Sequence, residues 1–397
     1  MTRSISPTSM SIILGLVAAV GPFAIDMYLP AMPDIGRDLG ASQHEVQWTI
    51  VGYFITFGLA QLVYGPWADQ AGRKPPLYVG LALFILGTVT CALAPSLGWL
   101  VLGRMVQGAG GAANMVVLRA VIRDMATGPA ATRMMSTIMI VIAVSPLLAP
   151  LSGAGLLAIG SWRLVFWALL GASILSAALI HFAVPETLAE ANRQRFDMAS
   201  TMRGARTLLT NRGFLVMTFL AGFAFASFFV FIAAASFVYI GSFGLTATQF
   251  SLAFAVNAVG FFVASQFSAT ISARVGTLRM IRRATIGFAL ATFAGFGLAL
   301  AGMASLPVMM TTLFVGNMFL GVLMPSAQVQ ALEEHGAIAG LAASLGGTLQ
   351  MMAAGLLVVL AGPFLDGTAP PMLGAIALCG ALVLVLSRLI PRQAARA

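Results

Sequence analysis

The sequence predicts an all-α integral membrane protein with twelve transmembrane helices in two pseudo-symmetric six-helix halves, and two observations carry that prediction. Of the 397 residues, 59% are apolar and only 8% are charged, whereas a soluble domain has about 25% charged residues. A soluble domain with so few charges would expose larger apolar patches than soluble monomers show. The apolar residues also fall into twelve runs, each close to the length of about 20 residues that a spanning helix needs.

The twelve runs predict twelve helices in two sets of six. The first run is longer than a signal-peptide core and precedes no small-residue cleavage site, so we expect it to be a membrane helix. A polar, arginine-rich stretch follows the sixth run and divides the chain into an N-terminal half at 1–184, a linker at 185–212 and a C-terminal half at 213–397. The predicted spans are Met10–Met32, Val46–Pro66, Leu77–Pro95, Leu97–Arg119, Met134–Ala158, Trp162–Val184, Gly213–Tyr239, Phe250–Ile271, Ala284–Met303, Pro307–Ala331, Ala337–Ala361 and Pro370–Ile390.

The basic residues predict that both termini lie in the cytoplasm. Cytoplasmic loops of membrane proteins are enriched in Lys and Arg. If the N-terminus is cytoplasmic, 17 of the 21 basic residues fall in cytoplasmic segments, and only Arg37 and Arg163 fall in outer ones. We therefore attribute the net charge of +9 to the inner loops, and we expect no nucleic-acid partner although a basic chain can indicate one.

The loop after the second predicted helix, Gly65 to Leu77, has the sequence GPWADQAGRKPPL. It resembles the loop signature of the major facilitator superfamily and departs from it at Trp67 and Gln70. Two parallel halves of six helices are also the plan of these transporters. The resemblance therefore implies the major facilitator fold.

The same resemblance implies that this loop forms part of a cytoplasmic gate. A glycine at position 72 allows a sharp turn between two helices. Asp69 is expected to accept backbone N–H groups at the N-terminus of the eleventh helix, near Ala337 to Leu341, where a carboxylate is favoured. Arg73 is expected to pair with Asp124 at the end of the fourth helix. The alternative is a solvated basic turn. The expected gate residues are Gly65, Asp69, Gly72, Arg73, Lys74 and Asp124.

The fourth predicted helix contains LVLGRMVQGAGGAA from Leu100 to Ala113. This stretch resembles the fourth-helix signature of the superfamily, with Arg104 and Gln107 at matching positions. An arginine inside an apolar helix is costly, so Arg104 is expected to face the bundle interior and to find a partner there. The stretch also matches a loose dinucleotide-binding fingerprint, but no strand precedes it. Its glycines are therefore interpreted as sites of close helix packing.

The most informative stretch is Phe23 to Gly40, FAIDMYLPAMPDIGRDLG. It resembles the drug:proton antiporters of the superfamily and, among them, the bicyclomycin-resistance or CflA-type subfamily. The segment from Ser145 to Gly153 corresponds to the fifth-helix antiporter motif. It departs from that motif because Ala149 and Ala154 stand where the motif usually has glycine. Its matching residues are Pro146, Pro150 and Gly153, and further subfamily-like pieces include Trp162–Arg163 and Pro185–Leu188.

Asp26 is the candidate proton carrier by elimination, because the interiors of the predicted helices hold almost no other ionisable side chain apart from Arg104. Desolvation favours a neutral carboxyl group, and a nearby cation favours the carboxylate. Movement of Arg104 toward or away from Asp26 would therefore change the protonation of the Asp26 carboxyl group. A cationic or polar drug could compete with the proton for this same carboxylate. The alternative is a solvated Asp26 in the outer headgroup layer.

By analogy with the family, the substrate cavity is expected to combine Asp26 with an apolar wall from the fifth and seventh helices. An apolar, aromatic wall suits lipophilic drugs, whereas ordinary packing is the alternative for each wall residue. The wall residues are Ile142, Pro146, Pro150, Phe228, Phe231 and Ile232.

The pattern and the resemblance together predict a secondary transporter that exports small amphiphilic drugs in exchange for protons. The resemblance places it in the bacterial inner membrane, as a functional monomer. Export of a metabolite such as a nucleoside or sugar, or a facilitator without proton coupling, are the alternatives. A lipid-processing enzyme is disfavoured, because Glu333, Glu334 and His335 form the sole cluster of acidic and histidine residues. The chain has no P-loop and no metal-ligand spacing, so neither a cofactor nor a metal is expected.

Overall fold

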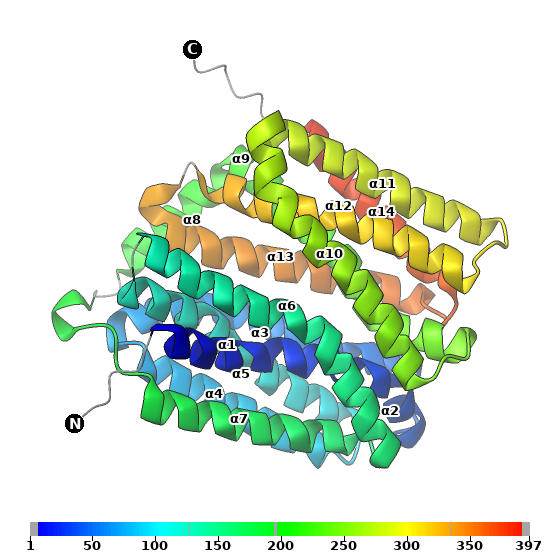
Figure 1. The fold of residues 1–397 in the computed structure, drawn as a ribbon, viewed down its shortest axis with the longest axis horizontal. Helices are drawn as coiled ribbons and strands as arrows, with labels where there is room; N and C mark the ends of the chain where they lie inside the picture. The colour runs from blue at the N-terminus through cyan, green and yellow to red at the C-terminus, as the bar shows by residue number, and fades with distance from the viewer. Residues whose placement is uncertain (1–6, 127, 194–196, 334, 391–397) are drawn as a thin grey trace. The chain divides into compact units, whose positions relative to one another are not determined.

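The computed structural model describes residues 7–126, 128–193, 197–333 and 335–390. Within these residues every regular element is a helix, and twelve helical segments are long and apolar enough to cross a membrane (Figure 1). The expected all-α chain with twelve spans is therefore confirmed. The α-helices are α1 (Pro7–Asp26), α2 (Met32–Asp38), α3 (Gln43–Ala71), α4 (Lys74–Ala92), α5 (Leu97–Met125), α6 (Gly128–Ile159), α7 (Arg163–Ala183), α8 (Met198–Thr210), α9 (Arg212–Ser236), α10 (Ala247–Val275), α11 (Thr277–Leu300), α12 (Leu306–Glu333), α13 (Ala339–Ala361) and α14 (Ala369–Arg388).

Polar caps make the helices longer than the apolar runs that predict them. The second span, expected at Val46–Pro66, is α3 and begins at Gln43. The Ser42 hydroxyl accepts a hydrogen bond from the Glu45 N–H, and the Glu45 carboxylate accepts one from the Ser42 N–H at 2.8 Å. This capping box satisfies N–H groups that have no partner in the first helical turn.

Prolines divide the first span after Asp26. α1 ends there, a short 3-10 helix follows at Leu29–Ala31, and α2 continues to Asp38. Pro30 and Pro33 lie in the first positions of these two short helices, where an N–H would have no helical partner and proline is favoured. The helical path therefore extends beyond the expected end of the apolar run, and it is interrupted next to the candidate proton carrier.

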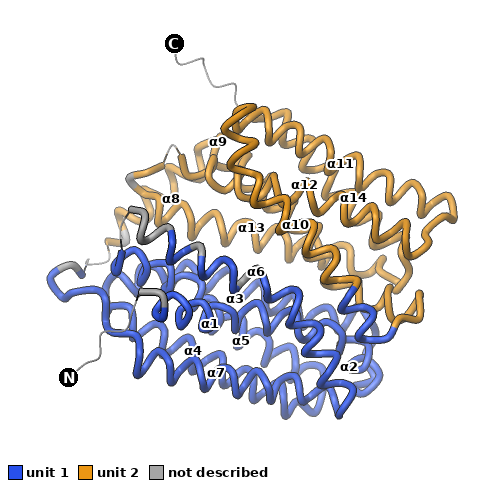
Figure 2. The backbone as a smooth tube through the Cα atoms, in the orientation of Figure 1, with its two compact units in different colours: residues 1–196, 246–252 blue, residues 197–245, 253–397 orange. Residues whose placement is uncertain are grey.

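The chain forms two compact units, coloured separately in Figure 2. The first consists of residues 1–196 and 246–252, and the second of residues 197–245 and 253–397. In the first unit, α3 and α4 pack against α5, and α1 packs against α6 and α7. In the second unit, α9 packs against α12, α13 and α14, and α11 packs against α12 and α14.

The polar linker expected at 185–212 contains a helix that the apolar pattern does not reveal. The carboxylate of Asp197 caps α8 by accepting a hydrogen bond from the Ala199 N–H at 2.9 Å. α8 belongs to the second unit, where a Cβ at Gly204 would lie 2.7 Å from the Leu341 side chain of α13. Its 13 residues are too few for a span, which needs about 20.

Candidate functional site

Arg73, in the turn between α3 and α4, is the centre of an ion-pair cluster in the first unit. Its Nε donates to Asp124 Oδ2 at 2.6 Å and its Nη2 to Asp124 Oδ1 at 3.1 Å, so the guanidinium group holds both carboxylate oxygens. Its Nη1 donates to Asp69 Oδ1 at 2.6 Å. Only 3% of the Arg73 side chain is exposed, against 46% of the Asp69 side chain. The expected pair of Arg73 and Asp124 is confirmed, and its part in gating stays a prediction.

Glu186 completes this cluster, although no motif assigns it a role. Its carboxylate accepts hydrogen bonds from the backbone N–H groups of Arg73 at 2.8 Å, Lys74 at 3.0 Å and Leu188 at 3.0 Å. It therefore caps α4, whose first N–H groups have no helical partner. Burial alone would raise the pKa of Glu186, but the three N–H groups outweigh burial and hold that pKa below its usual value.

Gly72 fits this turn for two independent reasons. Its φ of +96° lies in the left-handed region that favours glycine. A Cβ at this position would also lie 2.7 Å from Glu186 Oε2. Thr187, the residue after Glu186, also binds the cluster, because its hydroxyl donates to Asp124 Oδ2 at 3.0 Å. The start of the linker is thus hydrogen-bonded both to the α3–α4 turn, through Glu186, and to the end of α5, through Thr187.

The remaining expected gate residues contribute less to this cluster. Gly65 lies within α3, where a Cβ would meet Val116 at the ordinary contact distance of 3.8 Å, so packing does not demand a glycine there. Lys74 begins α4, and its Nζ donates to the His181 carbonyl at 3.4 Å. The expected contact between Asp69 and the eleventh helix would join the two units, and it stays a prediction.

Arg104 of α5 is completely buried, at 0% exposure. Its Nη1 donates to the Ala24 carbonyl of α1 at 3.0 Å and to the Gln107 side-chain oxygen. The centre of its guanidinium group lies 4.9 Å from the ring centroid of Tyr28 and 4.5 Å from that of Tyr53, within the range of cation–π attraction. The expectation that Arg104 faces the interior and finds partners is confirmed, and those partners are π faces, an amide and a carbonyl.

The two tyrosine rings are functional candidates to which the motifs assign no role: Tyr28 stands in the Phe23–Gly40 stretch, and Tyr53 lies outside every motif. Tyr28 OH and Thr49 Oγ1 are 2.7 Å apart, and this contact connects the break in the first span to α3. Tyr53 lies in the middle of α3 and is buried. A tyrosine inside an apolar run was the available signal, because a buried hydroxyl needs a partner.

Asp26 is the last residue of α1, and only 5% of it is exposed. This burial argues against a solvated carboxylate, and the depth of Asp26 in the membrane stays a prediction. Among the described residues, Asp26 is the one buried carboxylate, and it forms no ion pair with Arg104. Arg104 instead binds the carbonyl of Ala24, two residues earlier. The structure thus places the buried cation of α5 against α1, two residues before the candidate proton carrier, without pairing the two groups.

The fifth-helix motif brings α6 close to the break in the first span. A Cβ at Gly153 would lie 2.1 Å from the Met27 carbonyl oxygen, so this approach requires glycine. Pro146 and Pro150 both lie inside α6. The carbonyl of Pro150 accepts a hydrogen bond from Ser251 Oγ at 2.9 Å.

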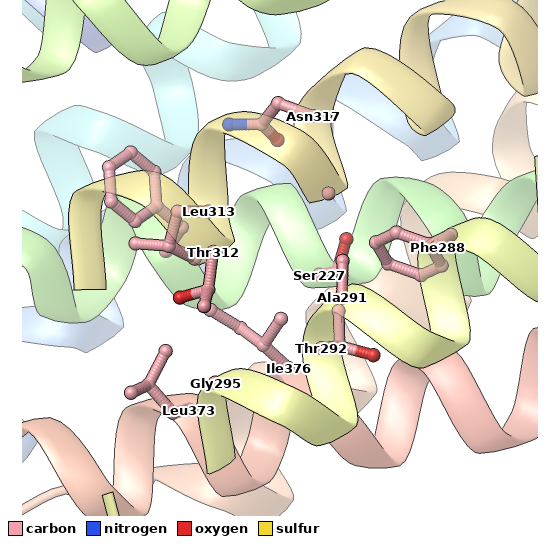
Figure 3. A pocket seen from close by; sticks show the side chains of 12 residues that line it. Ser227, Phe288, Ala291, Thr292, Gly295, Thr312, Leu313, Asn317, Leu373 and Ile376 are labelled. Atoms are coloured by element: carbon pink, nitrogen blue, oxygen red, sulfur yellow. The ribbon is translucent and has the colours of Figure 1, made fainter. Parts of the chain in front are cut away.

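The expected cavity wall draws on both units, with Ile142, Pro146 and Pro150 in the first and Phe228, Phe231 and Ile232 in the second, so it stays a prediction. Phe231 lines a pocket inside the second unit, between α9, α11, α12 and α14 (Figure 3). Phe228 and Ile232 do not line this pocket. Phe228 lies near Phe254, with 6.4 Å between the ring centroids, and Ile232 is 1% exposed. The side chain of Ile142 lies outside the described residues.

Among the described residues, no group of three or more His, Cys, Asp or Glu side chains could hold a metal ion. Glu334, one member of the cluster weighed for a lipid-processing enzyme, lies outside the described part of the chain.

Two units of membrane-spanning helices, a buried cation and a buried carboxylate define a polytopic membrane protein with the organisation of a transporter. The chain belongs to the Major Facilitator Superfamily, whose sequence profile matches residues 14–358. It is 31% identical to the Bicyclomycin resistance protein homolog of Haemophilus influenzae over 369 residues, which cover 92% of each chain. It is 30% identical to Multidrug resistance protein D of Escherichia coli over 384 residues, covering 95% of this chain and 94% of that protein.

The solved structures agree with this fold. The inward open conformation of the xylose transporter XylE from E. coli superposes with a TM-score of 0.76 and covers 98% of each chain. The sequence identity is only 15%, so this likeness concerns the fold and not the substrate.

Proposed function

We propose that this protein is a proton-coupled antiporter that exports small amphiphilic drugs by alternating access across the bacterial inner membrane. The relatives named for bicyclomycin and multidrug resistance support a drug as the cargo. In this proposal the halves at 1–184 and 213–397 alternate, the linker at 185–212 connects them, both termini are cytoplasmic, and a single chain is the functional unit.

Asp26 carries the proposal, because it is the one buried carboxylate among the described residues. A buried carboxyl group is stable when it is neutral or when a cation pairs with it. A drug that places a cationic or polar group against Asp26 takes the place of the proton, and a returning proton displaces the drug. This competition couples outward movement of the drug to inward movement of protons.

Arg104 supports the coupling, because it holds a positive charge next to the break in the first span. It binds the Ala24 carbonyl, and the helical path is interrupted after Asp26. A shift at this break changes the distance between the cation and the carboxylate. The carboxylate is then favoured in one state and the neutral acid in the other.

The Arg73 cluster supports a cytoplasmic gate. Arg73 is 3% exposed and holds both oxygens of Asp124, and a charge this far removed from water is costly to leave unpaired, so Arg73, Asp124 and their neighbours are expected to move as one body. In the proposed cycle, Asp69 of this body makes its contact with the eleventh helix in one state and loses it in the other.

The test is proton release from the purified, detergent-solubilised protein when chloramphenicol is added in weakly buffered solution. Wild type is expected to release protons in proportion to bound drug, and Asp26→Asn is expected to release none. The matched control is Asp366→Asn. Thr368 donates hydrogen bonds to Asp366 and holds its pKa below the usual value, so Asp366 is ionised at neutral pH and its loss leaves the release unchanged.

Two results overturn the proposal in different ways. Drug binding without proton release from wild type excludes exchange at Asp26 and favours a facilitator or another coupling ion. No binding of drugs favours export of a metabolite such as a nucleoside or sugar.

A further inference from the structure

A relay of buried hydrogen bonds runs from Arg104 of α5 to the backbone of α4. Arg104 Nη1 donates to the Gln107 side-chain oxygen, and Gln107 Nε2 donates to Thr88 Oγ1 at 2.8 Å. The Thr88 hydroxyl donates in turn to the Phe84 carbonyl at 2.6 Å. Arg104, Gln107 and Thr88 are each 0% exposed, so bulk water does not reach these three side chains. The fourth-helix motif supplies Arg104 and Gln107, but no motif assigns a role to Thr88.

Close packing of α4 on α5 brings Thr88 within reach of Gln107. A Cβ at Gly87 would lie 2.4 Å from the Gln107 backbone nitrogen and 2.6 Å from the Gly103 carbonyl oxygen. Backbone atoms cannot move aside as a flexible side chain can, so this approach requires glycine at position 87. The two backbones therefore set the position of the Thr88 hydroxyl relative to the Gln107 amide.

The Thr88 hydroxyl decides which end of the Gln107 amide faces Arg104. A threonine hydroxyl has one hydrogen to donate. The Phe84 carbonyl can only accept, so it takes that hydrogen, and the hydroxyl can then serve Gln107 only as an acceptor. The amide must therefore turn its NH2 end to Thr88 and its oxygen to Arg104, which has donors and no acceptor. Both ends of the relay thus demand the same orientation of Gln107.

The relay opposes movement of Arg104 toward Asp26. Both residues lie in the described part of the chain, and they form no ion pair there. Instead, the Gln107 oxygen and the Ala24 carbonyl both accept from Arg104 Nη1. Movement of the guanidinium group away from Gln107 breaks the bond between them and leaves a buried amide oxygen without a donor, which is costly.

We propose that Thr88 is a positioning residue of the proton-coupling site. By accepting from the Gln107 amide, Thr88 keeps the amide oxygen on Arg104 and so keeps the cation off the Asp26 carboxyl group in this state. The orientation of Gln107 stands on the hydrogen bonds alone. Its consequence for the protonation of Asp26 rests on the proposed function, to which it adds a residue of α4.

The test is the pH dependence of proton release when chloramphenicol is added to the purified, detergent-solubilised protein. Release stops at pH values where Asp26 is already ionised without the drug. Thr88→Val keeps the shape of the side chain and removes the hydroxyl, so Arg104 is freer to reach Asp26 and to favour its carboxylate. The midpoint of release is therefore expected to move by about half a unit to one unit toward lower pH, the equivalent of one hydrogen bond.

Other titratable groups near Arg104 do not set this midpoint. They are the phenols of Tyr28 and Tyr53 and the thiol of Cys91. The ordinary pKa values of phenols and thiols lie above about 8. A midpoint below that range therefore reports on Asp26.

Two further variants of α4 are the controls. Thr88→Ser keeps the hydroxyl and can donate to the Phe84 carbonyl in the same way, so it is expected to keep the wild-type midpoint. Thr90→Val removes a hydroxyl that donates to the Leu86 carbonyl at 2.9 Å on the other side of α4, and it should leave the midpoint unchanged. A wild-type midpoint in Thr88→Val, or an equal shift in Thr88→Ser, would overturn the inference.

A thermal-unfolding cycle with Thr88→Val and Gln107→Leu tests the relay without any transport step. If the two side chains are bonded, the fall in unfolding temperature in the double variant is smaller than the sum of the two single falls. Additive falls would overturn the relay. No proton release from wild type together with a non-additive cycle would overturn the proposed function and leave the orientation of Gln107 supported, so the two proposals fail separately.

Discussion

Arg104 puts a permanent positive charge inside the first unit, because a guanidinium group is not deprotonated in proteins. Two tyrosine faces and the Ala24 carbonyl surround that charge. Its Nε and Nη2 have no hydrogen-bond partner among the described residues, and buried donors without partners are costly. In the proposed cycle these donors are free to bind an acceptor in another state, and Asp26 is the carboxylate that α1 can bring to them.

Glu186 leads to a prediction about pH. Its carboxylate accepts three backbone N–H groups that hold its pKa below the ordinary value of 4.5. A lowered pKa in the folded state means that the contact stabilises the protein above pH 4.5 and is lost as the pH falls through the lowered value. Glu186→Gln is therefore expected to reduce the free energy of unfolding by about 1 kcal/mol at neutral pH. The difference is expected to vanish at acidic pH.

The measurement is thermal unfolding in detergent at neutral pH and at about one unit below the ordinary glutamate pKa. Glu190→Gln is the matched control, because the Glu190 side chain is 89% exposed and its nearest cation is 3.9 Å away. A stability difference for Glu186→Gln that is the same at both pH values would contradict a role of its charge.

At the scale of elements, the approach of α6 to the break in the first span depends on Gly153. A Cβ at this position would lie 2.1 Å from the Met27 carbonyl oxygen, and a backbone atom cannot move aside as a flexible side chain can. Overpacking of this kind costs about 1 to 3 kcal/mol. Gly153→Ala is expected to lower the unfolding temperature and, because Met27 follows Asp26, to change proton release as well.

Gly155→Ala, two residues further along α6, is the control. It separates the clash with the Met27 carbonyl from the general effect of replacing a glycine by alanine in a helix. A Cβ at Gly155 meets nothing within 4 Å, and alanine is favoured over glycine inside a helix. Gly155→Ala should therefore be neutral or slightly stabilising. Equal unfolding temperatures for the two variants would show that the close contact with Met27 does not form in the folded protein.

The twelve spans could be predicted from the sequence because one physical term, the cost of polar groups in lipid, selects long apolar runs. Their ends could not, because hydrogen bonds of capping residues such as Ser42 set them and those residues lie outside the apolar runs. The apolar pattern does not reveal α8 for a related reason, since a short amphipathic helix inside the polar linker carries no spanning signal.

The candidate site likewise has parts that the sequence could predict and parts that it could not. The pair of Arg73 and Asp124 was predictable because the resemblance supplied both positions. The bond from the Arg73 N–H to Glu186 joins residues 113 positions apart, and no local pattern connects them. The pocket lined by Phe231 needs four helices to pack together, so its existence depends on side-chain packing that a single sequence does not specify.

At the scale of the whole molecule, the distribution of Arg and Lys among the loops determines how the chain is oriented in the membrane. The excess of Arg and Lys in alternate loops predicts cytoplasmic termini, and the proposed direction of drug movement depends on it. Two positions report on opposite faces. Ser96, in the loop before α5, is exposed and expected outside, while Glu190, in the linker, is exposed and expected inside.

Single cysteines at these positions test the orientation with a membrane-impermeant maleimide. The native Cys91 and Cys379 are both 0% exposed, and a buried thiol is inaccessible to the reagent, so the wild-type background is expected to be low. In intact spheroplasts Ser96→Cys should be labelled and Glu190→Cys should not, whereas both should react after lysis. The reverse pattern would place the Arg73 cluster on the outer face, where it would close the path on the side of drug release instead of the side of drug entry.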